Sequence, residues 1–125
     1  MIRAALRSLS TTDLRMLDIE RDYPEDPECF SLLMDAYIGP EGEPGQEQFS
    51  FYVRTPTWVA KQVADSGSLW EGALIVEHWD YRLVRSAVQA LCARATGSDW
   101  AAVAAQLGRH LMWEFDGMTD HSETL

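Results

Sequence analysis

FSLLMDAYIGPEGEPGQEQFSFYVR, residues 30–54, is the stretch that decides the fold. Its first part alternates, which predicts a strand with one apolar face. The residues on that face are Phe30, Leu32, Met34, Ala36 and Ile38. Phe49, Phe51 and Val53 alternate in the same way near its end. Residues 39–45 hold five of the chain's thirteen glycines and prolines and predict a turn-rich loop. Two strands joined by such a loop form an antiparallel hairpin.

The residues before this hairpin are expected to form a strand followed by a loop. Residues 2–9 alternate weakly and indicate a short first strand, with a helix beginning near Thr12 as the rival interpretation. Residues 22–28 read DYPEDPE. Two prolines three positions apart remove backbone donors and fix φ, so an extended acidic loop is expected there.

The chain after the hairpin predicts a helix and a further strand. Thr55-Pro56 ends the second hairpin strand and begins a short helix near Thr57, which Gly67 ends. The apolar run ALIV at residues 73–76 is typical of a central strand that is covered on both faces.

Two amphipathic helices follow. Asp80 is expected to cap the first. Its apolar stripe consists of Tyr81, Val84, Val88, Leu91 and Cys92. Ser98 is expected to cap the second after the break at residues 96–98. Its stripe consists of Trp100, Val103, Ala104, Leu107 and Leu111. Residues 112–115 are compatible with a final edge strand.

Strands come first and helices later, which predicts an α+β fold. We expect one domain over residues 1–116, with an antiparallel sheet of three to five strands and about three helices packed on one side. Residues 117–125 are polar and are expected to form a flexible tail.

Composition fits a folded protein of the commonest domain size. The chain has 125 residues, 46% of them apolar, which is enough for a core. No apolar run approaches the ~20 residues of a membrane span, and no signal-peptide pattern opens the sequence. We therefore expect a cytoplasmic protein with no membrane contact. Cys29 and Cys92, 63 positions apart, are expected to behave as small, partly buried hydrophobes.

The negative charge is concentrated in one region. Ten basic and twenty acidic residues give a net charge of -10, and residues 18–47 alone carry ten acids against Arg21. Phosphate contacts require Lys and Arg, so direct binding of nucleic acid is not expected. Such a charge would instead speed the capture of a basic partner.

The search for catalytic chemistry finds little. Glu77, His78 and Asp80 cluster in sequence, and His110 precedes Glu114 by four residues. Neither stretch has a known metal-ligand spacing, and helix capping explains Asp80. No nucleophile motif or phosphate-binding glycine loop is present in the sequence. We expect no catalytic, cofactor-binding or metal residues.

Five tryptophans are the remaining candidates for function. Trp58, Trp100 and Trp113 lie on or beside apolar stripes and are expected in the core. Trp70 and Trp79 flank the apolar run at 73–76, and partial exposure is expected for both. An exposed tryptophan beside acids would suit a protein interface.

Several strings, in this order and spacing, carry a resemblance. They are PEDPECF at residues 24–30, IGPEG at 38–42, FSF at 49–51 leading to TPTW at 55–58, LIVE at 74–77 and WEF at 113–115. The sequence resembles the immunity protein 8 family of bacterial polymorphic toxin systems, from about residue 2 to residue 116. The resemblance implies a small α+β protein that is not an enzyme, is encoded beside a toxin and binds the toxin domain.

The resemblance and the charge together predict an acidic surface that occludes the active site or an essential exosite of a cognate toxin domain. The residues expected to make contact are Glu25, Asp26, Glu28, Glu41, Glu43 and Glu47, with Trp113 and Glu114 as a second patch. Two alternatives stay open. One is a small metal-dependent hydrolase that uses Glu77, His78, Asp80 or His110. The other is a subunit that self-associates, so both a monomer and a homodimer are compatible with the sequence.

Overall fold

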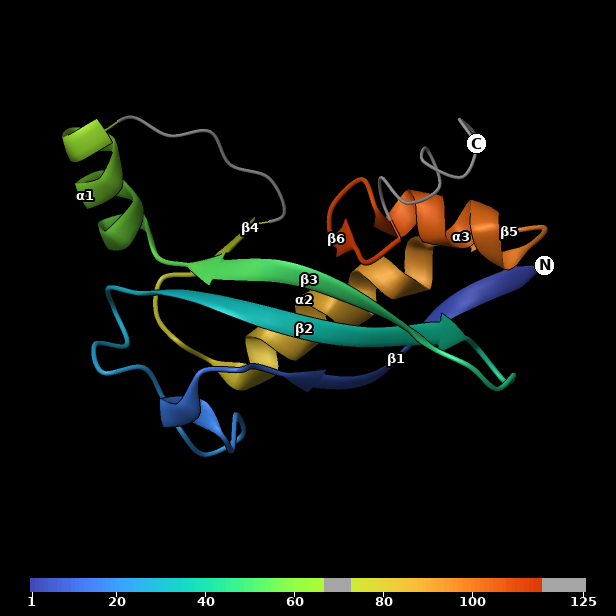
Figure 1. Cartoon of the computed structure of the whole chain (residues 1–125), viewed down its shortest axis with the longest axis horizontal. Helices are drawn as coiled ribbons and strands as arrows, with labels where there is room; N and C mark the ends of the chain where they lie inside the picture. The colour runs from blue at the N-terminus through green and yellow to red at the C-terminus, as the bar shows by residue number, and fades with distance from the viewer. Residues whose placement is uncertain (67–72, 116–125) are drawn as a thin grey trace.

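A computed structural model describes residues 1–66 and 73–115, and its elements alternate between a sheet and helices (Figure 1). The strands are β1 (Ile2–Ser10), β2 (Ser31–Pro40), β3 (Glu47–Arg54), β4 (Ala73–Ile75), β5 (Thr96–Gly97) and β6 (Met112–Trp113). The helices are the 3-10 helix η1 (Leu14–Met16) and the α-helices α1 (Pro56–Ser66), α2 (Tyr81–Arg94) and α3 (Trp100–Leu107). The expected α+β fold is confirmed.

The sheet is mixed rather than antiparallel. Its order is β4-β3-β2-β1-β5, and β6 pairs with β3 beside this path. Strand β4 runs parallel to β3, whereas β1, β2, β3, β5 and β6 form antiparallel pairs. A parallel pair needs a crossover connection, and the helix α1 lies in the segment that joins β3 to β4. The expectation of a purely antiparallel sheet was wrong in this respect.

The predicted hairpin is confirmed as the pair β2–β3. Ser31 pairs with Arg54 and Ile38 with Glu47, with an unbroken register between them. The turn contains two residues in left-handed conformations, Gly42 with φ of 77° and Gly45 with φ of 101°. Glycine adopts such φ values without steric cost, so the turn depends on both positions.

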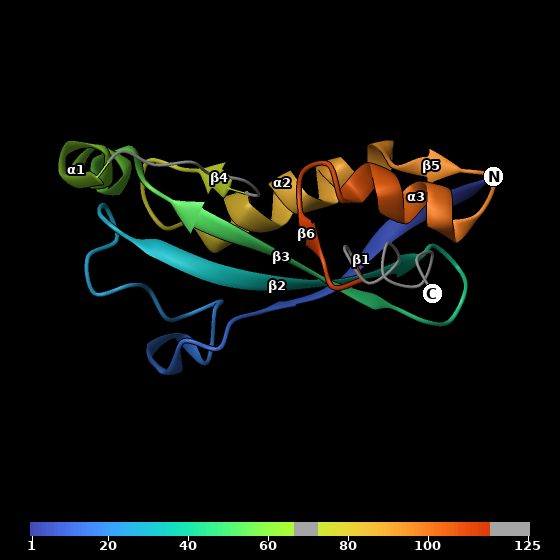
Figure 2. The ribbon, with the colours of Figure 1, turned by 45° about the horizontal axis from the view of Figure 1, so that its top comes forward.

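The core lies between one face of the sheet and the helices α2 and α3 (Figure 2). The face toward the helices is the apolar one predicted from the alternation. Its fully buried members are Met34, Ala36, Ile38, Phe49 and Val53. From α2 and α3, Val84, Val88, Cys92, Val103, Ala104 and Leu107 are buried against it. Both predicted helical stripes are therefore confirmed in their central positions.

The two helix N-termini differ in how well they were predicted. Asp80 caps α2 as expected, and its Oδ1 accepts hydrogen bonds from the backbone N–H groups of Arg82 and Leu83. The cap of α3 is Asp99, whose Oδ1 accepts from the Ala102 N–H at 2.8 Å. The expectation of Ser98 was wrong by one position because two adjacent residues can both act as N-caps.

The segment between β1 and β2 extends the core past the end of β1. The short strand expected first is confirmed over Ile2–Ser10, and the rival helix near Thr12 is limited to the single turn η1. The Thr11 hydroxyl donates to the Leu33 carbonyl at 2.7 Å, which fixes the segment beside β2. Met16 and Ile19 are then buried in the core cluster.

Two expectations near α2 were wrong. Trp79 is buried rather than partly exposed, because its ring packs edge-on against Phe30 with centroids 6.0 Å apart. Strand β4 is an edge strand rather than a central one, and Ile75 in it is 48% exposed. The predicted helix end at Gly67, the predicted exposure of Trp70 and the predicted tail at residues 117–125 lie outside the described residues.

Candidate functional site

The first predicted acidic group lies in the loop that precedes β2. Its exposed members are Glu25, Asp26 and Glu28. The Trp79 N–H donates to the carbonyl of Pro27 at 2.8 Å, which ties this loop to the start of α2. The Asp26 carboxylate also accepts from a backbone N–H within the loop at 3.0 Å. The loop is therefore held in place while its carboxylates face solvent.

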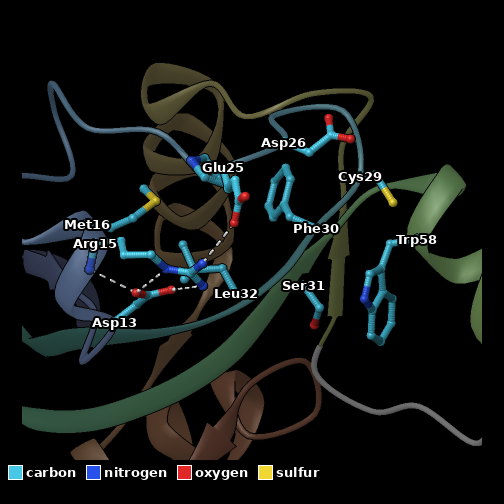
Figure 3. Close-up of a pocket in the computed structure, with 11 residues that line it drawn as sticks. Asp13, Arg15, Met16, Glu25, Asp26, Cys29, Phe30, Ser31, Leu32 and Trp58 are labelled. Carbon is cyan, nitrogen blue, oxygen red and sulfur yellow. Dashed lines mark hydrogen bonds and ion pairs between the residues drawn. The ribbon is translucent and has the colours of Figure 1, made fainter.

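A pocket of about 320 Å³ opens beside this loop (Figure 3). Three carboxylates and one guanidinium line it, together with apolar side chains that include Met16, Leu32 and Trp58. The charged members are Asp13, Arg15, Glu25 and Asp26. Net negative charge beside an apolar floor suits a basic side chain such as lysine or arginine, whose methylene stem can pack while its charged end meets the carboxylates.

Arg15 organises the charges at this pocket. Its backbone N–H and then its guanidinium hydrogen-bond to Asp13, and both interactions lower the pKa of that carboxyl. The Arg15 Nη1 also lies 3.4 Å from a carboxylate oxygen of Glu25. Asp13 therefore stays ionised at neutral pH and contributes negative charge to the pocket.

The second acidic group lies at the β2–β3 turn. Glu41 and Glu43 are exposed on the turn itself, and Glu47 is half-buried at the first position of β3. The Arg7 Nη2 donates to the carbonyls of Pro40 and Glu43 at 2.7 and 2.6 Å, which holds the turn. The Glu41 and Glu43 side chains thus project from a turn that hydrogen bonds and glycines keep in one shape.

Trp113 and Glu114 join this second group. The Trp113 indole N–H donates to the Glu47 carboxylate at 2.5 Å, and its ring stacks on Phe49 with centroids 6.2 Å apart. Glu114 accepts a hydrogen bond from the Gln48 N–H at 2.9 Å through its side chain and donates its own N–H to the Gln48 carbonyl. These contacts attach the chain after α3 to β3. Trp113 and Glu114 therefore stabilise the fold, in addition to any contact with a partner.

The two acidic groups lie at opposite ends of the sheet (Figure 1). Strand β2 separates them, and its ten residues span roughly 33 Å at ~3.3 Å per residue. The fold therefore places Glu41 and Glu43 on the β2–β3 turn and brings Trp113 and Glu114 to Glu47 and Gln48 at the start of β3. It keeps Glu25, Asp26 and Glu28 apart from both (Figure 1). The acidic region at residues 18–47 is continuous in sequence, but the fold divides its exposed carboxylates between the two ends of β2.

The residues of the hydrolase alternative are divided between two pockets, since His78 and Asp80 line one and His110 lines another. The Asp80 carboxylate caps α2, and Glu77 and His78 are exposed beside it. His110 follows α3, in a different pocket whose lining includes Leu91 and Arg94. Within residues 1–66 and 73–115, no three His, Cys, Asp or Glu side chains gather in a way that could hold a metal ion.

Neither cysteine takes part in an acid–base pair among the described residues. Cys92 is one of the buried residues of α2, and burial raises the pKa of its thiol to about 11. The thiol is therefore neutral at physiological pH and acts as a packing group, as the sequence predicted. Cys29 is a free, half-buried cysteine at the edge of the pocket beside Trp58.

Sequence reasoning missed one arrangement on the other face of the sheet. The Arg54 guanidinium lies 4.2 Å from the ring centroid of Tyr52 and 4.8 Å from that of Trp58, and its Nε donates to the Ser31 hydroxyl at 3.0 Å. Tyr52 and Arg54 were recognisable as the second face of β3, because they alternate with Phe51 and Val53. Trp58 was expected in the core instead.

The site thus consists of a small α+β fold with two exposed acidic groups. The family model of Immunity protein 8 matches residues 4–118 of the chain. The chain belongs to the Immunity protein 8 family, which makes it an immunity protein of a toxin system. Comparisons with curated proteins and with solved structures find no match.

None of the helices within the described part of the chain is long and apolar enough to span a membrane.

Proposed function

We propose that this protein neutralises a cognate bacterial toxin domain by binding it, and that its exposed acidic ends recognise a basic surface at or near the toxin's active site. Family membership carries the proposal. The charge distribution supports it, because ten of the chain's twenty acids fall within residues 18–47, and all of them except Asp35 lie before or after β2. The protein acts by binding rather than by catalysis, in the cytoplasm of the cell that it protects, as a monomer or a homodimer.

The electrostatics explain how such a protein would reach its target in time. Surface charge of opposite sign raises the rate of association by ~10 to 10³-fold at low ionic strength. The pocket beside Glu25 and Asp26 adds a place for one basic side chain of the toxin. Many toxins act on phosphate-containing substrates through basic clefts, and carboxylates from this chain would occupy positions that phosphates otherwise take.

Growth rescue tests the function itself. The probe is the C-terminal domain of the protein encoded immediately upstream of this chain's gene, expressed in a sensitive bacterium with and without this chain. The proposal predicts that cells expressing both grow, and that the two proteins co-purify. A domain that kills equally well in the presence of this chain would contradict the proposal.

Charge reversal tests the role of the acidic ends. Glu25→Lys and Glu43→Lys change one end each, and Glu77→Lys is a matched control because Glu77 is also exposed and belongs to neither group. At low salt we expect at least one of the first two variants to slow association by roughly 10-fold, and the loss to shrink as salt is raised. If neither variant differs from the Glu77→Lys control, the acidic ends do not recognise the toxin.

A further inference from the structure

One face of the sheet is left uncovered by the helices α2 and α3. Residues opposite each other on paired strands share a face, so the register defines this open face as a set of cross-strand rows. Its four rows are Ser31–Arg54–Ile75, Leu33–Tyr52–Ala73, Ser10–Asp35–Ser50–Met112 and Ser8–Tyr37–Gln48. We call these residues the open face. Helices α2 and α3 lie on the opposite side of the sheet (Figure 2), and Trp58 of α1 contacts the open face at Arg54, in its first row.

The centre of the open face is apolar and aromatic, and it carries no net charge. Leu33 on β2 is 39% exposed, and Ile75 on the edge strand β4 is 48% exposed. Tyr52 pairs with Leu33, and Tyr37 lies two rows further along β2. Tyrosine and arginine dominate the energetically important centres of protein interfaces, and lysine and glutamate are depleted there. The four rows contain neither lysine nor glutamate.

The two charged residues of the open face are already fixed by neighbouring side chains. Asp35 is 9% exposed, and its Oδ1 accepts hydrogen bonds from the Ser50 hydroxyl at 2.8 Å and the Gln48 amide at 3.0 Å. Arg54 is stacked between Tyr52 and Trp58. A surface whose polar groups are held in this way loses little conformational entropy when a partner covers it.

The size of the open face fits one protein partner. Strands spaced ~4.8 Å apart and ~3.3 Å per residue make a face of at most about 600 Å². A standard interface buries about 800 Å² on each partner. The open face together with the acidic loops at its two ends therefore approaches the area of one stable interface.

The charge around the open face identifies the partner as basic. Glu25, Asp26 and Glu28 precede the first row, and Glu41 and Glu43 follow the last. The open face carries no net charge and lies between two acidic loops. Protein interfaces commonly have such an arrangement, with an apolar centre and a polar rim. A second copy of this chain does not fit, because each copy has a net charge of -10 and the same acidic ends.

We infer that the open face is the docking surface for a basic face of the toxin domain, with Leu33, Tyr52 and Ile75 at the centre of the contact. This inference rests on the proposed function and adds to it where the toxin sits. The acidic ends govern the approach of the toxin, and the open face provides the buried contact that holds it.

A pair of opposite charges at one exposed position separates burial from electrostatic attraction. Leu33→Arg and Leu33→Glu both place a charge at the centre of the open face. Leu83→Arg and Leu83→Glu are the matched controls, because Leu83 is a leucine of similar exposure, 48%, on the helix α2 of the opposite side. The probe is the upstream-encoded C-terminal toxin domain, its affinity is measured by calorimetry, and circular dichroism verifies that each variant is folded.

Docking on the open face predicts that Leu33→Arg and Leu33→Glu each weaken binding by roughly 100-fold, since either charge would be buried in the contact. Long-range attraction alone would let Leu33→Glu bind the basic toxin as well as the wild type or better. That outcome would overturn the inference while leaving the proposed function intact. Both Leu83 variants are expected to stay within about 3-fold of the wild type.

Further outcomes separate this inference from the proposed function. Ile75→Glu, on the edge strand β4 beyond β3, is a second test of the same face, and it should weaken binding as the Leu33 variants do. A wild-type homodimer in sedimentation that Leu33→Glu dissociates would assign the open face to a second copy and overturn the inference. A wild-type protein that does not bind the toxin domain at all would refute the proposed function, and this inference with it.

Discussion

The two faces of the hairpin β2–β3 are built from the same strands and differ in nearly every property. On the covered face, Met34, Phe49 and Val53 have no exposed surface. On the open face, their immediate neighbours Leu33, Ser50 and Tyr52 reach solvent. Successive side chains of a strand point to opposite faces, so alternation divides the hairpin into one side that stabilises the fold and one side that is available for a partner.

This division has a consequence for how the protein tolerates change. Side chains on the covered face are enclosed by the helices, and any loss of volume there leaves a cavity. Side chains on the open face contact mainly their cross-strand neighbours, and their replacement costs less. The fold is therefore expected to tolerate substitutions on the open face better than substitutions on the covered face.

Truncation at adjacent positions of β3 gives the largest expected effect and tests the comparison directly. Phe51→Ala removes a buried ring from the covered face and should lower the free energy of unfolding by about 3–5 kcal/mol. Tyr52→Ala, one residue later, removes a stacking partner of Arg54 and should cost only about 1 kcal/mol. Urea denaturation measures both. Equal losses would show that the open face contributes to the core after all.

A buried hydroxyl at the end of β3 gives the next largest effect. Thr55 is fully buried, and its Oγ1 accepts a hydrogen bond from the Phe30 N–H at 3.2 Å. Thr55→Val keeps the shape of the side chain and leaves that N–H without its partner, which should cost about 1–3 kcal/mol. Thr55→Ser keeps the hydroxyl and should lower stability less than Thr55→Val does. Thermal unfolding of both variants measures the difference. A valine variant more stable than the serine variant would contradict this role.

Capping of α3 on the covered side gives a smaller effect and also tests the corrected N-cap. Asp99→Ala removes the acceptor of the Ala102 N–H and should lower stability by about 1 kcal/mol. Ser98→Ala should stay within about 0.5 kcal/mol of the wild type because it removes no capping hydrogen bond of α3. If Ser98→Ala is the more damaging of the two in chemical denaturation, the helix begins one residue earlier.

The smallest expected effect is a pH dependence of stability that comes from Asp13, in the segment between β1 and β2. The Arg15 backbone N–H and guanidinium lower the pKa of Asp13 in the folded state. The carboxylate therefore stabilises the fold fully above the ordinary carboxyl pKa of about 3.9. This stabilisation is lost as pH falls through the lowered pKa of the folded state. The advantage of the wild type over Asp13→Asn should be about 0.3 kcal/mol or less at pH 7, because this pair is solvent-screened. It should disappear below the folded-state pKa in denaturation curves recorded against pH. An advantage that grows in acid would contradict the assignment.

Much of the covered side could be predicted from the sequence because local patterns determine it. Alternation defined the apolar face of β2 and β3, and helical spacing defined the buried stripe of α2. The exposure of Ile75 could not be predicted in this way, because a short apolar run is compatible with both a central and an edge strand. The parallel pairing of β4 also depends on a crossover whose path local sequence does not determine.

Charge counting named candidate residues, whose contact with a toxin stays a prediction, and it did not predict how the fold arranges them. Charge counting identified Glu25 and Glu43 as members of one acidic region. Their separation follows from the length of β2, which places the two loops at opposite ends of the sheet. The open face escaped sequence analysis for a related reason. Whether Tyr52 and Leu33 face solvent depends on where the helices pack, and that is a property of the whole fold.

The structure of this chain in complex with its toxin domain tests the central claim most directly. The account predicts that a basic surface of the toxin covers Leu33, Tyr52 and Ile75, with its cations near the acidic end that contains Glu25 or the one that contains Glu43. Helices α2 and α3 would keep their present exposure. A toxin bound across α2 and α3, with the open face still exposed to solvent, would contradict the account.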